Sequence, residues 1–305
     1  MIRYIVARIL QAVPTVIGIA AFTFFLVRMT GNPESVMLPP DASDAEIASF
    51  RERYGLDQPI LVQFIAFFRN ALVFDFGESI RYGAPVTELL AARIGPTLLL
   101  AGASLAIALL IGLSMGYLAG LWHGGRLDRF GRTLAFTGQS VPSFYLGILL
   151  ILIFSVNLQW FNSIGPISPQ RLVLPAVTLS LAIVPIVLRV ARGSVLDVSR
   201  QGYIRTAQSK GLTEQQVLRR HIGKNAAIPV VTIVGLQLGS ALSGAVVTET
   251  VFSWPGVGRF LVEAISTRDF PVVQAVTILA AFTYVLVNLL VDIAYAFLDP
   301  RIRYR

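Results

Sequence analysis

The residues of this chain that could carry chemistry are few, and most of them are basic. Both lysines, Lys210 and Lys224, lie in the stretch 202–229, and neither follows the glycine run that cradles nucleotide phosphates in a P-loop. The chain has no G-x-S-x-G elbow, no H-E-x-x-H pair and no paired-carboxylate motif. It has no cysteine, and its histidines, His123 and His221, are far apart in the sequence. The sequence therefore predicts no catalytic residue, no P-loop ATP hydrolysis and no metal site in this chain.

The stretch 202–229 is basic and strongly punctuated. Gly211 lies where a helix would end in a left-handed residue. Thr213, with Gln216 three residues later, has the pattern of a capping box that starts a second helix. The second helix would have one apolar side, formed by Val217, Leu218 and Ile222. Two short helices joined by a sharp corner suit a docking element for another protein, but a basic loop that only fixes topology remains an equal alternative.

The composition indicates the class of protein to which this stretch belongs. Of the 305 residues, 55% are hydrophobic and 14% are charged, and the mean hydropathy is +0.70. Soluble domains carry about 25% charged residues. Because the apolar residues come in blocks rather than in amphipathic periods, the sequence predicts an all-α polytopic membrane protein.

Six blocks are long enough to cross a bilayer, which takes about 20 apolar residues each. We place these spans at Ile9–Val27, 97–121, 134–156, 172–188, 227–247 and 272–297. The chain then divides into an N-terminus with the first span, a helical segment between the first two spans, a membrane-spanning core containing a loop, and a tail: 1–29, 30–96, 97–297 with the loop 189–226, and 298–305. Four prolines inside or near span ends predict kinks: Pro14, Pro142, Pro175 and Pro185.

The outer segment 30–96 has recognisable local structure. A polar helix is predicted over Asp41–Tyr54, with Ser43 as its N-cap. The apolar run Ile60–Phe74 is too short for a span and is interrupted by polar residues, which predicts an amphipathic helix at the membrane interface.

The basic residues predict the orientation. With six spans, both termini and the loop 189–226 share one side, and that side holds sixteen of the 25 lysines and arginines. Because basic residues accumulate on the cytoplasmic side, both termini and this loop are predicted to be cytoplasmic in the cell membrane. The same distribution explains the net charge of +8 without nucleic acid.

Few polar groups lie near the spans. Glu249 and Asp292 fall towards span ends, not at mid-depth, so no proton- or sodium-coupled site is evident. Asp292 is more readily explained by a structural ion pair. Four polar residues are candidates to line a pathway, although each could simply bond between helices: Gln139, Ser140, Gln237 and Ser240.

The loop after the fifth span is apolar and rich in turns. Phe252, Trp254 and Phe260 would not stay exposed to water. The loop therefore either folds back to plug the outer mouth of a pathway or packs on the segment 30–96.

Several motifs together resemble the permeases of ATP-binding-cassette (ABC) importers, in the dipeptide/oligopeptide/nickel branch. Tyr203–Leu212, Val217–His221 and Asn225–Pro229 resemble the EAA-type cytoplasmic coupling loop, although Arg205-Thr-Ala207 replaces Glu-Ala-Ala. Other matching motifs extend over the whole chain: Gly31-Asn-Pro33, Tyr54–Pro59, Phe76–Ser79, Ser140–Phe144, Glu249–Gly258 and Leu298–Arg303. The long outer segment resembles the B-type subunit. This resemblance implies the six-helix type I importer fold.

The resemblance also implies partners and substrate. Such a subunit pairs with a homologous C-type permease, two ABC ATPase subunits or one fused ATPase, and an extracytoplasmic solute-binding protein. ATP and Mg would bind the ATPase partners, and no cofactor is expected in this chain. The implied cargo is a dipeptide or oligopeptide, with nickel, glutathione or another small solute as the alternative. An ion-coupled carrier or channel is the third hypothesis.

The resemblance assigns two sets of site residues. The residues expected to couple to the ATPase are Arg205, Thr206, Ala207, Lys210, Gly211, Leu218, Arg219 and His221. The residues expected to form an outer gate or a substrate loop are Phe252, Trp254, Pro255 and Gly256.

Overall fold

The structure, a computed structural model, describes residues 2–298; side chains at 2–9, 12, 240, 242–244 and 292–298 are outside the description. Every regular element in the described part is a helix, and the only β-contact there is an isolated bridge between Glu78 and Pro85. The prediction of an all-α protein is confirmed. The chain divides into two compact units, whose boundaries fall inside two long helices and directly after Ser253.

The first unit contains residues 99–253 and continues from Leu286. Its helices are α5 (Val86–Leu121, from Leu99 onward), α6 (Arg126–Ser140), α7 (Ser143–Leu150), η1 (Ile151–Asn157), α8 (Pro169–Ser199), α9 (Gly202–Ser209), α10 (Glu214–Gln216), η2 (Val217–Gly223) and α11 (Lys224–Val251). The central helix is α8, which packs against α6, α7 and α11 and has more buried residues than any other helix in the described part of the unit.

Three glycines let α5 and α8 approach closely. Gly112, Gly116 and Gly120 recur at every fourth position, which places them on one face of α5. A Cβ at Gly116 would lie 2.7 Å from the Leu188 carbonyl oxygen and 2.7 Å from the Ala191 Cβ. The absence of side chains therefore sets the distance between the two helices, as in other membrane helix pairs that use small residues.

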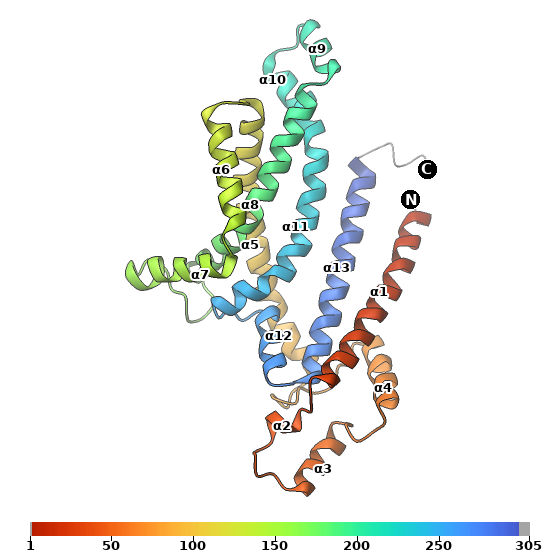
Figure 1. The fold of residues 1–305 in the computed structure, drawn as a ribbon. Coiled ribbons are helices and arrows are strands. Elements are labelled where there is room, and N and C mark those ends of the chain that lie inside the picture. The colour runs from red at the N-terminus through yellow and green to blue at the C-terminus, as the bar shows by residue number, and fades with distance from the viewer. Residues whose placement is uncertain (1, 299–305) are drawn as a thin grey trace. The chain divides into compact units, whose positions relative to one another are not determined.

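The third predicted span, 134–156, is not one straight helix. α6 and the α7–η1 stretch meet at an angle of 98°, and Figure 1 shows α7 turned away from the axis of α6. Val141 between them is extended, with ψ 122°, because the ring of Pro142 disfavours helical backbone in the preceding residue. The kink predicted at Pro142 is therefore confirmed, but it is a break in the helix and not a bend. Pro14, Pro175 and Pro185 remain inside continuous helices.

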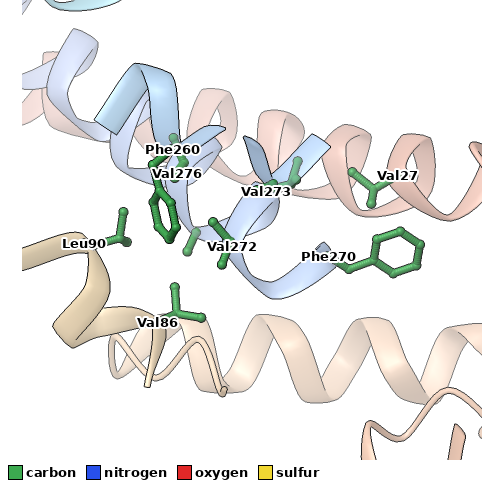
Figure 2. Packing of buried hydrophobic residues seen from close by; sticks show 10 residues of the cluster. Val27, Val86, Leu90, Phe260, Phe270, Val272, Val273 and Val276 are labelled. Atoms are coloured by element: carbon green, nitrogen blue, oxygen red, sulfur yellow. The ribbon is translucent and has the colours of Figure 1, made fainter. Parts of the chain in front are cut away.

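The second unit contains residues 2–98 and 254–285. Its helices are α1 (Ile2–Met29), α2 (Glu34–Met37), α3 (Asp44–Arg53), α4 (Ile60–Leu72), the first part of α5, α12 (Val257–Ser266) and the first part of α13 (Phe270–Leu298). Figure 2 shows its core, where Val86 and Leu90 of α5 meet Phe260 of α12 and Val272 of α13. Asp269 stabilises the packing beside this core, because its buried carboxylate accepts hydrogen bonds from the Ser79 hydroxyl and the Ile80 N–H.

The predicted elements of the outer segment are present, with one shifted boundary. Ser43 caps α3, as predicted, and also forms a capping box with Glu46 that was not predicted. α4 covers most of the predicted helix Ile60–Phe74. The helix of the second span begins at Val86, well before the predicted boundary at residues 96 and 97. Those additional turns carry Glu88 and Arg93, and because these charges interrupt the apolar pattern, the sequence did not predict the early start of the helix.

Among the described residues, four helical stretches are long and apolar enough to cross a membrane: Val86–Leu121, Pro169–Ser199, Glu214–Gly239 and Phe270–Val291. The bent pair of α6 with α7 and η1 makes a fifth if it counts as one span. The stretch Val13–Met29 of α1 is apolar but shorter. The total of six spans stays a prediction, and most of the predicted tail, residues 299–305, lies outside the described residues.

Candidate functional site

The loop predicted to dock a partner is a compact helical element at the end of the first unit (Figure 1). α8 continues to Ser199, a turn at Arg200 and Gln201 follows, and α9 begins at Gly202. The residues that hold this element to α8 form what we call the loop cluster: Val195, Val198, Ile204, Ala207, Val217, Ile222 and Ala226. Because the cluster joins α8, α9, η2 and α11, the element is packed onto the long helices and is not a free loop.

The corner between the two short helices depends on Gly211. Its φ is +77°, in the left-handed region that residues with a Cβ disfavour. The Gly211 N–H donates to the Gln208 carbonyl at 3.0 Å, and the Leu212 N–H donates to the Ala207 carbonyl at 3.4 Å. These two bonds form a Schellman motif, which ends α9 as the sequence predicts.

The second short helix starts as predicted. The Thr213 hydroxyl accepts a hydrogen bond from the Gln216 N–H, and the Gln216 side chain accepts one from the Thr213 N–H at 3.0 Å. The π-helical turn η2 then runs from Val217 to Gly223 and continues directly into α11. Val217 and Ile222 are buried in the loop cluster, while Arg219 is exposed on the opposite side.

Polar contacts that the sequence did not reveal fix the orientation of η2. The Tyr117 hydroxyl on α5 donates to the Leu218 carbonyl at 3.3 Å. The Asn225 side chain donates to the Tyr203 hydroxyl at 3.0 Å and to the His221 carbonyl at 2.8 Å. Tyr203 and Asn225 lie inside the motifs quoted for the resemblance, but only the folded chain shows that they join α9 to α11.

The predicted coupling residues divide by exposure. Arg205, Thr206, Lys210, Gly211 and Arg219 are exposed, whereas Leu218 and His221 are half-buried and Ala207 is buried. Within the described residues, no carboxylate forms an ion pair with Arg205, Lys210 or Arg219. The element therefore has unpaired cations on its surface, while Ala207 allows α9 to approach the loop cluster.

A buried carboxylate fixes the neighbouring turn between α5 and α6. Asp128 is fully buried, and its oxygens accept from Arg192 of α8 at 2.5 and 3.1 Å and from the Gly124 N–H at 3.0 Å. His123 lies 3.4 Å from the same carboxylate. The only signal in the sequence was one acid among several arginines, which did not identify Arg192 as its partner.

The second predicted site, Phe252 to Gly256, is mostly buried. In the first unit Phe252 packs against Gly147, where a Cβ would lie 3.1 Å from the Phe252 ring. In the second unit Trp254 is fully buried and its indole N–H donates to the Pro96 carbonyl at 2.9 Å. Gly256 precedes α12 in an extended conformation, and Pro255 is exposed.

Phe260 joins the same core as Val86 and Leu90. Of the two alternatives for this loop, packing on the segment 30–96 is therefore confirmed for the part from Trp254 to Phe260. The role of Phe252, Trp254, Pro255 and Gly256 as an outer gate or substrate loop stays a prediction.

The predicted pathway residues are not joined into one polar site in the described part. Gln139 of α6 accepts a hydrogen bond from Arg189 of α8, and the exposed Ser140 donates to the Phe136 carbonyl at 2.9 Å. Gln237 is half-buried on α11, and the side chain of Ser240 lies outside the described residues. Among the residues described, no three His, Asp or Glu side chains gather into a group that could hold a metal ion.

Comparison with known protein families gives two matches that together cover most of the chain. Residues 108–304 match the model of the binding-protein-dependent transport system inner membrane component. Residues 1–100 match the model of the N-terminal part of such membrane components.

Two curated relatives extend over the whole chain. The glutathione transport system permease protein GsiC of Salmonella typhimurium is 42% identical over 306 residues, covering 100% of both chains. The protein of the same name from Escherichia coli K12 is 40% identical with the same coverage.

Solved structures share the fold. Two inward-facing forms of the MetNI methionine ABC transporter match with TM-scores of 0.58 and 0.59 at 19% and 20% identity. They cover 70% and 69% of this chain, and 97% and 96% of the solved chains. An amino acid ABC transporter with histidines matches with a TM-score of 0.52 at 17% identity, over 70% of this chain and 94% of the other. At these identities the likeness establishes the fold alone.

Proposed function

The chain belongs to the family of binding-protein-dependent transport system inner membrane components, and we propose that it passes glutathione or a similarly short peptide into the cell. It is a membrane-spanning permease subunit of an ABC importer. The observation that carries the proposed cargo is the 42% identity to a glutathione permease over the full length of both chains. This favours the glutathione alternative over a general dipeptide or nickel importer.

The element from Gly202 to Ala226 is the proposed docking site for an ATPase. Its exposed cations, Arg205, Lys210 and Arg219, would meet acidic groups of that partner, and the short helix would lie in a groove on its surface. The family likeness and the unpaired cations together favour this role over that of a loop that only fixes topology. The excess of basic residues on this side supports a cytoplasmic location for the element and both termini.

The proposed mechanism transmits ATPase movement through α8. The loop cluster ties α9 and η2 to α8, and close contact through Gly112, Gly116 and Gly120 ties α8 to α5. A displacement of the docking element would therefore move these helices as one body, as in rigid-body switching. ATP drives this change only by binding one conformation better than the other.

ATP hydrolysis is assigned to separate subunits, because this sequence has no P-loop. We propose a homologous second permease, one or two ATPase chains and an extracytoplasmic solute-binding protein as partners. ATP and Mg would bind the ATPases. Phe252–Gly256 would form an outer gate, held in place by its buried aromatic side chains, and Gln139, Ser140, Gln237 and Ser240 would contribute polar groups along the pathway.

Uptake by proteoliposomes tests the function. Vesicles with the assembled transporter and its binding protein should accumulate labelled glutathione only when ATP is present on the side of the membrane that carries the ATPase subunits. An excess of nickel should not reduce this uptake. Uptake of dipeptides but not glutathione would contradict the cargo and leave the permease role intact. Uptake by vesicles that contain this chain without an ATPase would contradict the mechanism.

The corner glycine tests the coupling. Gly211→Pro cannot adopt a φ of +77° and removes the N–H that bonds to Gln208, so we expect loss of ATP-driven uptake with normal membrane insertion. Gly202→Ala is the matched control, because a Cβ there meets nothing within 4 Å and the residue has no positive φ. Normal uptake by Gly211→Pro would mean that the corner does not couple the two subunits.

A further inference from the structure

One face of α4, the helix predicted to lie at the membrane interface, is apolar and exposed. Leu61, Ile65 and Leu72 are 64%, 65% and 69% exposed. Val73 and Phe74, which follow the helix directly, are also largely exposed. Exposed apolar surface of this kind is normally covered by lipid or by another protein. The position of α4 beside α1 indicates which of the two covers it.

The contacts between α4 and α1 show that the two helices run in opposite directions. Gln63, near the start of α4, accepts hydrogen bonds from Arg28, at the end of α1, at 2.9 and 2.8 Å. One turn later on α4, Phe67 stacks on Phe24, one turn earlier on α1, with ring centroids 5.5 Å apart. Phe64 lies between these levels and contacts Phe24 at 5.2 Å. As α4 proceeds, it therefore moves back along α1.

The side of α4 that faces α1 continues to the end of the helix. Its half-buried residues follow the helical repeat: Gln63, Phe64, Phe67, Phe68 and Ala71. Continuing the register of the observed pairs places Ala71 beside Ala20 of α1. Ala20 is seven residues before Val27, the end of the predicted span, which corresponds to about 10 Å along the helix.

We propose that α4 is inserted to a shallow depth in the membrane beside α1, and that its exposed residues Ile65 and Leu72 with the tip Val73 and Phe74 contact lipid acyl chains. The leaflet is the one that surrounds the Arg28 end of α1, which is the outer leaflet in the proposed orientation. The occupant is lipid and not protein because α4 follows a membrane span inwards, so the environment of α1 at that depth is also the environment of α4.

The backbone at the end of α4 suits this location. In hydrocarbon, polar backbone groups must be satisfied within the chain. The Asn70 carbonyl accepts from the Val73 N–H at 3.1 Å and the Asp75 N–H at 3.0 Å, and the Ala71 carbonyl accepts from the Phe74 N–H at 3.1 Å. Phe74 reverses the chain with a φ of +58°.

The charge of Arg69 is compatible with the same depth. Arg69 is exposed in the last turns of α4, and a long arginine side chain can keep its stem in the apolar layer while its guanidinium reaches the headgroups. The helix is therefore inserted at a shallow depth, with only its tip far from water.

Site-directed spin labelling tests the proposal, because this chain has no cysteine and a single introduced cysteine is its only labelling site. A transporter assembled with the unsubstituted chain measures the signal from the other subunits. A nitroxide is attached to Ile65→Cys or Leu72→Cys in the assembled transporter in phospholipid bilayers. Its collisions with apolar oxygen and with a water-soluble nickel chelate are then compared. Phe22→Cys, exposed on α1, is the membrane control, and Ser49→Cys, exposed on α3, is the aqueous control.

We expect oxygen accessibility to exceed that of the chelate at positions 65 and 72, as at 22, with the reverse at 49. The excess should be larger at 72 than at 65, because α4 moves deeper towards its end. Greater access of the chelate at both positions would place α4 in water and overturn the proposal. Low access of both reagents would show that a protein covers the face, which also overturns it.

Discussion

Two helix pairs of this molecule show opposite ways of making a contact. α5 and α8 meet through glycines, so that backbone lies against backbone, and Gly112 and Gly120 leave no room for a Cβ beside Val187 and Val195. α1 and α4 meet through large rings, with Phe24 fully buried between Phe64 and Phe67. The first contact tolerates no additional atom, whereas the second consists of side chains that can adjust.

The difference matches the proposed roles of the two regions. α8 must carry movement from the docking element, and a contact between backbones transmits displacement with little loss. No such movement is assigned to α1 and α4. α3 buries none of its residues and borders an open groove of about 850 Å³ with α1 and α4. It is held by the Glu34–Arg51 ion pair at 2.6 Å and by its cap.

The largest effect is expected where α5 comes closest to the backbone of α8. Gly116→Ala places a methyl group 2.7 Å from the Leu188 carbonyl oxygen, which cannot move without moving α8. Overpacking of this kind costs about 2 kcal/mol. We expect a lower melting temperature of the purified assembly, together with reduced ATP-driven uptake.

Gly102→Ala is the matched control in the same helix, because a Cβ there meets nothing within 4 Å. Alanine is favoured over glycine in helices by about 0.5–1 kcal/mol, so this variant should melt at the same or a higher temperature. Equal destabilisation by both substitutions would contradict the account of α5 and α8.

A smaller effect is expected at the aromatic contact. Phe24→Leu keeps an apolar side chain but loses the ring contacts with Phe64 and Phe67 and the Arg28 guanidinium 3.6 Å above the Phe24 ring. Aromatic pairs contribute about 1 kcal/mol beyond their area. The melting temperature should fall less than for Gly116→Ala, and uptake should be nearly normal.

Phe22→Leu provides the comparison, because Phe22 is exposed on the same helix. It should leave the melting temperature unchanged. A larger loss of uptake for Phe24→Leu than for Gly116→Ala would reverse the roles that we give to the two helix pairs.

Local signals in the sequence predicted local structure well. The left-handed Gly211, the capping box at Thr213, the cap at Ser43 and a kink at Pro142 were all predicted from neighbouring residues. Each of these features is decided within a few residues of the chain, so spacing and residue type are sufficient to predict it.

Contacts between distant parts of the chain were not predictable. The Tyr117 bond to η2 and the Arg192 pair with Asp128 join residues 101 and 64 positions apart. The α4 register against α1 likewise depends on which turns face each other. The early start of α5 was hidden because Glu88 and Arg93 interrupt the apolar pattern of its first turns.

The smallest effect is expected at the cap of α3. The Ser43 N–H donates to the Glu46 carboxylate at 2.8 Å, and this bond lowers the pKa of Glu46 below its ordinary value. The capping contribution is therefore present above the unfolded pKa of about 4.3 and is lost as the pH falls through the lower folded pKa.

Hydrogen exchange of the α3 amides measures this effect. After correction for the intrinsic pH dependence of exchange, protection of α3 should decrease as the pH falls through that range. Ser43→Ala should lower protection several-fold at neutral pH and remove most of this pH dependence. A pH dependence that is unchanged in Ser43→Ala would show that another group controls the helix.

The central claim is that the element from Gly202 to Ala226 touches the ATPase, and cross-linking tests it most directly. Because the chain has no cysteine, Arg219→Cys and Ser49→Cys give single reactive sites on the docking element and on α3. In the assembled transporter, a short thiol-to-amine cross-linker should join position 219 to the ATPase, and position 49 should not reach it. Cross-linking of position 219 only to the extracytoplasmic binding protein, or of position 49 to the ATPase, would contradict the account.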